Sequence, residues 1–370
     1  DDNRAVRDLY HGGDVDRIPW HLWLPVLSRW FVLIVAYHLM LLSALVILRR
    51  QWVENERLAF PMAQVPLAMV QDNGSPNSII KPFFKNPVMW AGFLFCFLIN
   101  STNILHNYVP WIPAFMGQAE FMIFREQIEI QLRINFLMLG FGYFINTGVA
   151  FSIWFFYLLK LAQHGILLTL GIDPAQNLAP VSGSIFGHQM MGALVVLVLF
   201  GLWTARSHLK EVLRKAWNSD APVDDSREIM SYRTAVLCFL GGAAVVFVWL
   251  WLSGFPAWIA PIFIFAILVI MIGLARVIAE TGIPTVTPSM GPATFVMSSI
   301  GATALGMEGV VAAGYTLVWA GGFLTFVTAP MANALRLGSE ITRHRRALVI
   351  AIMSASAIAI AAGTWYWIYL

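Results

Sequence analysis

Long apolar stretches, separated by short polar clusters, dominate the pattern of this chain. Most of them contain no charged residue, and each is close to the length of about 20 residues that a helix needs to cross a bilayer. The pattern predicts membrane-spanning helices over residues 30–48, 87–105, 184–203, 232–252, 258–275, 309–329 and 347–369. We therefore expect an all-α, polytopic helical membrane protein with about eight or nine spans, plus re-entrant or broken helices.

Three stretches fit this pattern less simply. Residues 134–161 are apolar but interrupted by glycines and Asn146, which suits close helix packing or local unwinding. Either this stretch forms two half-helices, or residues 162–180 also cross. Residues 58–71 are too short to span and suit a re-entrant or interfacial segment. The sequence FREQIEIQLR, which ends at Arg133, predicts an amphipathic surface helix.

One broken stretch, residues 271–301, organises the chain. An apolar run reaches Arg276 and Glu280 and is then interrupted by Gly282 and Pro284, with two further prolines at intervals of four. Prolines at this spacing cannot lie inside one regular helix. Non-helical backbone is tolerated at membrane depth only inside protein or beside water. This stretch is therefore where we expect function.

Composition agrees with a membrane protein and excludes several other classes. Of the 370 residues, 59% are hydrophobic and 12% are charged. The net charge of +3 comes with short Lys and Arg clusters, which indicate cytoplasmic loops rather than a nucleic-acid surface. Two cysteines in apolar runs support neither a disulfide framework nor a metal site. No hydrolase or nucleotide-binding motif is present, so we expect neither an enzyme nor a cofactor.

The residues around the break suggest a pathway for a substrate or an ion. Arg276 and Glu280 are four apart and can face each other on one side of a helix, either as a neutralising structural pair or as a functional pair. The helix geometry places Glu280 near the inner interface, which favours a gate or an inner vestibule. The broken backbone that follows is either a packed kink or the lining of a cavity. Its candidate lining residues are Thr281, Gly282, Pro284, Thr287, Met290 and Gly291.

A second, shorter stretch loosely echoes the first. Glu56 and Arg57 precede Pro61, much as Glu280 precedes Pro284. Transporters built from inverted repeats leave such traces. We therefore place Glu56, Arg57 and Pro61, together with Asn146, among the candidate pathway residues.

Three motifs in this order resemble the oligopeptide transporter superfamily. They are LRRQWVENERLAFPMAQVPLAMV, ARVIAETGIPTVTPSMGPATFV and APMANALRLGSEITRHRRALVIAIMSASAIA, and they cover roughly the last 320 residues. Departures such as Asn333 and Arg336, where the family has Asp and Lys, suggest a divergent, uncharacterised bacterial branch whose N-terminal helices are missing here. The resemblance implies proton-coupled transport of a peptide or a metal chelate.

The sequence thus predicts one transmembrane domain over residues 1–370, as a fragment of a longer chain. Its first bundle, 1–217, ends in a cytoplasmic helix over 204–217, and its second bundle covers 231–370. We expect a proton-coupled secondary transporter in a bacterial inner membrane, with cytoplasmic basic loops. Its partners are the lipid bilayer, a small-molecule substrate and protons; a homo-oligomer or a larger membrane complex stays open. The alternative function is a non-transporting scaffold or subunit that retains the transporter fold.

Overall fold

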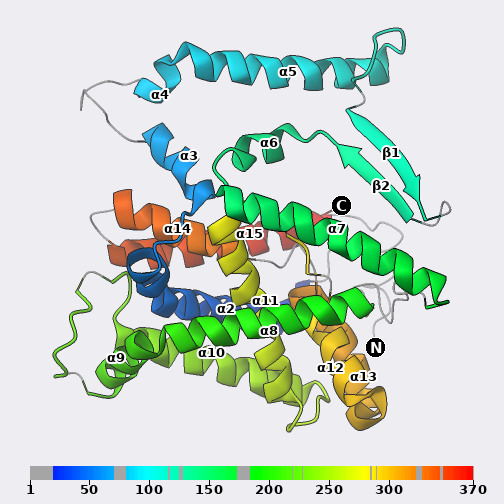
Figure 1. Cartoon of the computed structure of the whole chain (residues 1–370). Helices are drawn as coiled ribbons and strands as arrows, with labels where there is room; N and C mark the ends of the chain where they lie inside the picture. The colour runs from blue at the N-terminus through cyan, green and yellow to red at the C-terminus, as the bar shows by residue number, and fades with distance from the viewer. Residues whose placement is uncertain are drawn as a thin grey trace. The chain divides into compact units, whose positions relative to one another are not determined.

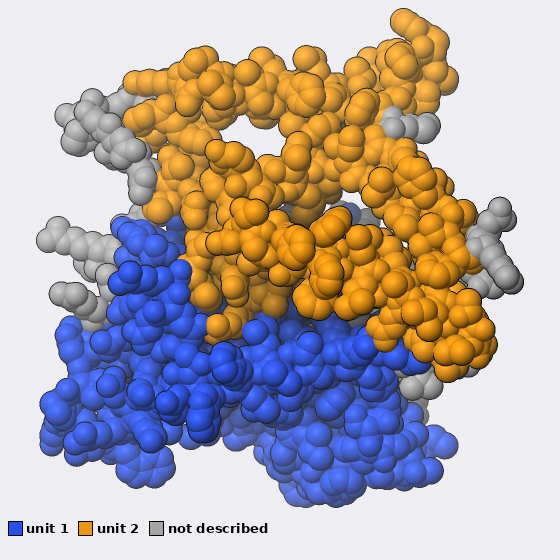
Figure 2. Space-filling model, viewed as in Figure 1, with its two compact units in different colours: residues 1–57, 177–275, 287–370 blue, residues 58–176, 276–286 orange. Residues whose placement is uncertain are grey.

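The computed structural model describes residues 20–70, 81–115, 117–124, 128–172, 184–218, 220–226, 228–283, 286–288, 290–321, 327–341 and 345–369. It is 78% helical, with one small two-stranded sheet in the described part (Figure 1). The chain forms two compact units (Figure 2). Unit 1 comprises residues 1–57, 177–275 and 287–370, and unit 2 comprises residues 58–176 and 276–286.

Unit 1 is a bundle of helices. It contains α2 (Trp20–Arg50), the π-helical turn η2 (Gln51–Asn55), α8 (Ile185–Thr204), α9 (Arg206–Trp217), α10 (Tyr232–Leu252), most of α11 (Ala260–Thr281), α12 (Pro292–Ile300), α13 (Ala302–Ala320), α14 (Thr328–Ile341) and α15 (Arg345–Tyr369). Its core gathers buried side chains from α2, α10, α11, α12 and α13. Trp319 lies edge-on to Tyr37 and Phe263, with ring centroids 5.2 and 6.2 Å apart. Aromatic packing of this kind joins three helices that are distant in the sequence.

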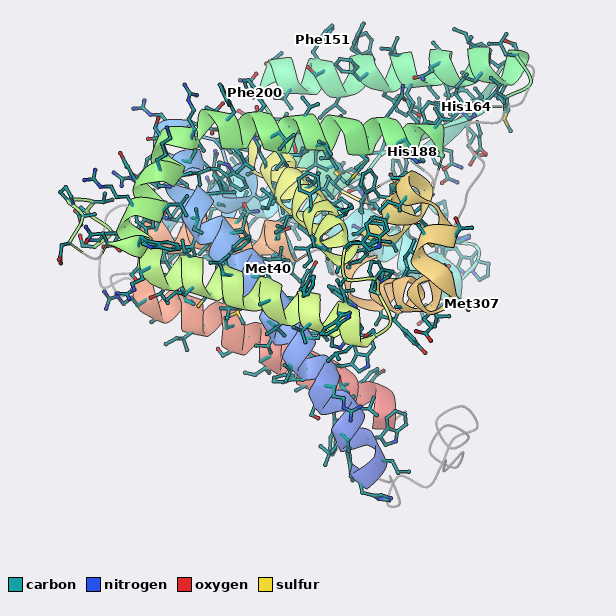
Figure 3. All side chains as sticks on the ribbon, turned by 90° about the horizontal axis from the view of Figure 1, so that it is seen from below. Met40, Phe151, His164, His188, Phe200 and Met307 are labelled. Carbon is teal, nitrogen blue, oxygen red and sulfur yellow. The ribbon has the colours of Figure 1, made fainter. Side chains whose placement is uncertain are left out.

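The contact between α2 and α10 depends on a glycine. A Cβ atom at Gly242 would lie 2.7 Å from the carbonyl oxygen of Ala36 and 2.9 Å from the Cβ of Met40. Small residues allow such close approach of two helices in a membrane protein. Figure 3 shows Met40 where α2 and α10 cross. The two helices are thereby held backbone to backbone.

Unit 2 combines helices with a hairpin. It contains α3 (Pro61–Val70), α4 (Pro82–Lys85), α5 (Pro87–Tyr108), β1 (Gln118–Ile123), β2 (Ile128–Arg133), α6 (Phe136–Gly142), α7 (Thr147–Thr169) and the last residues of α11. The antiparallel strands pair from Ile123 with Ile128 to Gln118 with Arg133. The expected amphipathic helix is therefore wrong over Ile128–Arg133. Isoleucines and leucine alternate with polar residues there, a period of two that suits a strand.

Seven helices in the described part are long and apolar enough to cross a membrane: α2 with η2, α5, α7, α8, α10, α11 and α15. This composition is that of an integral membrane protein. The expected span at 232–252 coincides with α10, and the other six helices overlap expected spans or the open stretch 134–180. The expected span at 309–329 corresponds to α13, which is interrupted at Gly306 (φ +71°) and is not one of the seven. The short segment 58–71 forms α3, which has 10 residues.

Exposed apolar side chains cover several of these helices. Phe151 of α7 and Phe200 of α8 are 58% and 66% exposed. Both residues are labelled in Figure 3. Exposed aromatic and aliphatic residues on long helices suit contact with lipid tails.

Candidate functional site

Two interrupted helices meet within unit 2. The helix α11 ends at Thr281, and α3 begins at Pro61 after Phe60, whose backbone is left-handed (φ +44°). The backbone N–H of Phe60 donates a hydrogen bond of 2.8 Å to the carbonyl oxygen of Ala279. The last carbonyl groups of a helix have no partner inside it. The chain entering α3 therefore satisfies part of the end of α11.

Gly282 makes this junction possible in two ways. Its φ of +69° lies in the left-handed region, which residues other than glycine rarely adopt. A Cβ atom there would also lie 2.6 Å from the Cβ of Pro61 and 2.8 Å from its Cγ. The two proline-containing segments identified in the sequence, which are about 220 residues apart, thus touch through Gly282 and Pro61.

The structure does not join the expected charged pair. Arg276 is half-buried, whereas Glu280 is exposed and forms no hydrogen bond or ion pair with the side chains that the structure describes. Thr281 is buried, and its Oγ1 accepts a hydrogen bond of 3.3 Å from the N–H of Ile283. The hydroxyl of Thr281 therefore helps to end α11, and Glu280 is left as an exposed carboxylate beside the break.

Glu56 and Arg57, the other expected charged residues, belong to unit 1. The helix α2 ends through the π turn η2, and the buried Gln51 donates a hydrogen bond of 2.9 Å from Nε2 to Oε1 of Glu56. Asn55 Nδ2 donates in turn to Oε1 of Gln51 at 2.8 Å. Arg57 follows with a left-handed backbone (φ +53°). Single π turns occur often at functional sites, and this one holds Glu56 in a defined place.

The other residues that were expected to line the break between α11 and α12 differ in their burial. Met290 is 2% exposed, and Gly291 is the buried N-cap residue of α12, whose first helical residue is proline. Thr287 is exposed. Pro284 lies outside the described residues. The break is therefore lined by buried groups at its α12 end.

Asn146, which was also placed among the candidate pathway residues, caps a helix at an exposed position. It is exposed, and its Oδ1 accepts a hydrogen bond of 2.9 Å from the N–H of Gly148, which caps α7. The interruption in 134–161 is thus a boundary between α6 and α7 and not a buried amide. The structure favours two separate helices over this stretch, and α7 continues to Thr169.

A buried ion pair was missed by the sequence analysis. Arg49 and Glu228 are 4% and 6% exposed, and Glu228 Oε2 accepts hydrogen bonds from Nε and Nη2 of Arg49 at 3.0 and 2.8 Å. The hydroxyl of Tyr232 donates to the other carboxylate oxygen at 3.3 Å. His208 Nε2 lies 2.8 Å from the carbonyl oxygen of Ile47, two residues before Arg49. This network ties the end of α2 to α9 and to the start of α10.

Possible metal ligands are dispersed. No three His, Cys, Asp or Glu side chains of the described residues gather closely enough to hold a metal ion. Cys96 and Cys238 are both free thiols.

A family model matches the whole chain, residues 1–370, and is described as a family of unknown function, DUF6785. The chain belongs to the DUF6785 family. No curated protein and no solved structure matches it.

Proposed function

We propose that this DUF6785 protein is a secondary active transporter, coupled to protons, for a small organic solute. The observation that carries the proposal is the junction in unit 2, where the break after α11 meets the break before α3. Transporters bind substrates and ions where membrane helices are discontinuous, because helix ends expose backbone groups that a ligand can use.

The few contacts at the junction of α3 and α11 support the proposal that these two segments can separate. Among the described residues, one backbone hydrogen bond, from Phe60 to Ala279, joins the two segments, and Gly282 allows their close contact. Phe60 and Arg57 hold left-handed backbones, which cost a non-glycine residue of the order of 1–3 kcal/mol. A few residues at element ends commonly absorb the backbone change of a hinge. The segment between Glu56 and Pro61 is the proposed hinge.

Glu280 is the proposed proton-coupling group. It is an exposed carboxylate next to the broken backbone, so a proton can reach it, and Arg276 lies one helical turn before it. A carboxylate that gains or loses a proton changes the charge of the gate, and this couples an ion gradient to opening. The resemblance to oligopeptide transporters supports a peptide or a metal chelate as cargo.

The test is uptake into proteoliposomes that contain the purified chain. An inward proton gradient is expected to drive accumulation of a transported solute, and Glu280→Gln is expected to lower gradient-driven uptake at least tenfold. Glu308→Gln changes a different exposed carboxylate, on α13, and is expected to leave uptake unchanged. Unchanged uptake by Glu280→Gln would show that Glu280 has no coupling role.

One observation favours the second candidate, a scaffold without transport activity. Thr281, Gly282 and Met290 are all buried in this conformation. A permanently closed break would suit a structural subunit. Absence of uptake for a broad panel of peptides and chelates, with the protein intact in the vesicles, would favour the scaffold.

A further inference from the structure

A pocket in unit 2 lies apart from the junction of broken helices. Its volume is about 550 Å³, within the range of small-molecule sites. Its wall combines the last turns of α5, the open end of the hairpin and the start of α6, with Asn100, Gln118, Arg133, Asn135, Phe115 and Phe136 among its lining residues.

Local hydrogen bonds hold the wall in place. Asn103 on α5 accepts a bond of 2.7 Å from the N–H of Phe115, and Ile134 N–H donates to the carbonyl of Gly117 at 2.7 Å. Phe136 lies edge-on to Phe95 of α5, with centroids 5.7 Å apart. These contacts connect the loop, the hairpin and α6 to one helix, so the pocket is preformed within unit 2.

The cation in this wall, Arg133, has no carboxylate partner among the described residues. Arg133 is paired with Gln118 on the last rung of the hairpin, and its Nη2 donates to Oε1 of Gln118 over a long 3.5 Å. No carboxylate of the described residues lies within 4 Å of it. A guanidinium has five N–H donors, and most of them are free to bind a ligand here.

The two amides beside Arg133 also offer donors. Oδ1 of Asn135 accepts hydrogen bonds from the N–H groups of Leu137 and Met138, at 3.0 and 3.2 Å, which turns its NH₂ group the other way. Oε1 of Gln118 accepts from Arg133, so the NH₂ group of Gln118 is also available to a ligand. Among the polar lining residues, unused donors outnumber unused acceptors. Such a wall suits a ligand that only accepts hydrogen bonds, and an anion is the best acceptor.

We infer that this pocket binds a small organic carboxylate with an apolar body. The carboxylate lies against Arg133 with the NH₂ groups of Gln118 and Asn135, and the apolar part packs against Phe115 and Phe136. The binding itself does not depend on transport; the view that the bound carboxylate is cargo rests on the proposed function.

The probe is phenylacetate, and its control is phenylacetamide, which has nearly the same shape but no charge. Binding to the purified full chain is measured by calorimetry in nanodiscs of phosphatidylcholine, without any gradient. Phenylacetate is expected to bind at least tenfold more tightly than phenylacetamide. Equal binding of the two, or no binding of either, would overturn the inference.

Three variants locate the site. Arg133→Gln is expected to weaken phenylacetate binding at least tenfold, while Arg206→Gln, which removes the same charge from exposed α9, leaves it unchanged. Gln118→Glu places a carboxylate opposite Arg133 and should compete with the ligand. Asn135→Asp retains a good helix cap but replaces the donor, so it should weaken binding without unfolding the chain. If none of these three pocket variants changes the affinity, the anion binds elsewhere.

A lipid headgroup could also supply an anion. Nanodiscs with one-third phosphatidylglycerol test this source. Phenylacetate affinity that does not change with this lipid supports a solute site, whereas strong competition by the lipid would overturn the proposal of a soluble ligand. Transport is measured separately, so failure of uptake and failure of binding are distinguishable.

Discussion

The buried pair Arg49–Glu228 shows how much one residue can be misjudged from its neighbours in the chain. Arg49 lies at the end of a long apolar run, where a basic residue predicts a cytoplasmic boundary. Its partner is 179 positions away, in an acidic turn, so no local pattern links them. Asn146 shows the opposite error, since an amide between glycines inside an apolar run suggested burial but caps an exposed helix end.

Removing one member of this pair should be costly. Glu228→Gln removes the buried carboxylate that faces the buried Arg49, and it is expected to lower stability by about 3–5 kcal/mol. Glu54, which also contacts Arg49 at 3.5 Å but is about half exposed, provides the matched control. Glu54→Gln is expected to cost less than about 1 kcal/mol. The measurement is unfolding of the purified protein by denaturant in mixed micelles; equal effects of the two variants would contradict the burial argument.

At the scale of elements, length and hydrophobicity predicted most of the helices. Length and hydrophobicity were sufficient for α8, α10 and α15, because a bilayer requires a long apolar helix. The basic residues at helical spacing predicted α9. The hairpin β1–β2 was missed because a short alternating segment fits both a helix face and a strand. The similarity of the two proline-containing segments only suggested that they are related. Their contact could not be predicted, because a contact between one glycine and one proline produces no periodic pattern in the sequence.

The junction itself can be tested with two glycines. Gly282→Ala adds a Cβ that would clash with Pro61, in addition to the cost of its left-handed backbone. Gly171 has a similar φ of +76° with nothing within 4 Å of the added Cβ. Both changes should cost about 1 kcal/mol for the backbone, and Gly282→Ala should cost a further 1–3 kcal/mol for the clash.

The effect is measured as the shift in thermal unfolding temperature of each variant in the same detergent. An equal shift for both variants would mean that the contact with Pro61 does not contribute to stability.

At the scale of the whole molecule, the chain order does not follow the two compact units. Unit 2 is built from one long segment and a short return, 276–286, which carries the end of α11 and the first part of the break. The chain passes between the units at residues 57–58, 176–177, 275–276 and 286–287. All of these except 176–177 lie next to the residues that the sequence marked by their prolines and charges.

The orientation of the helices in the membrane is a further prediction. The basic helix α9 and the lysines beside α4 are expected on the cytoplasmic side, and the end of α5 near Tyr108 on the opposite side. In a variant without Cys96 and Cys238, a cysteine at Lys210 should be protected from an impermeant maleimide in intact cells, and one at Tyr108 should react. Reaction at Lys210 together with protection at Tyr108 would reverse the orientation.

The hairpin β1–β2 also indicates where this part of the chain lies relative to the membrane. A two-stranded ribbon has an outer edge of backbone N–H and C=O groups on each strand, and such edges need water or protein partners, which lipid tails cannot supply. The strands β1 and β2 therefore belong at the level of the lipid headgroups or beyond. The helix α5, which precedes the hairpin, is about 33 Å long at 1.5 Å per residue. This length is close to the thickness of a hydrocarbon core, about 30 Å. We therefore expect the hairpin at the membrane surface, where Arg133 at its open end is accessible to a dissolved anion.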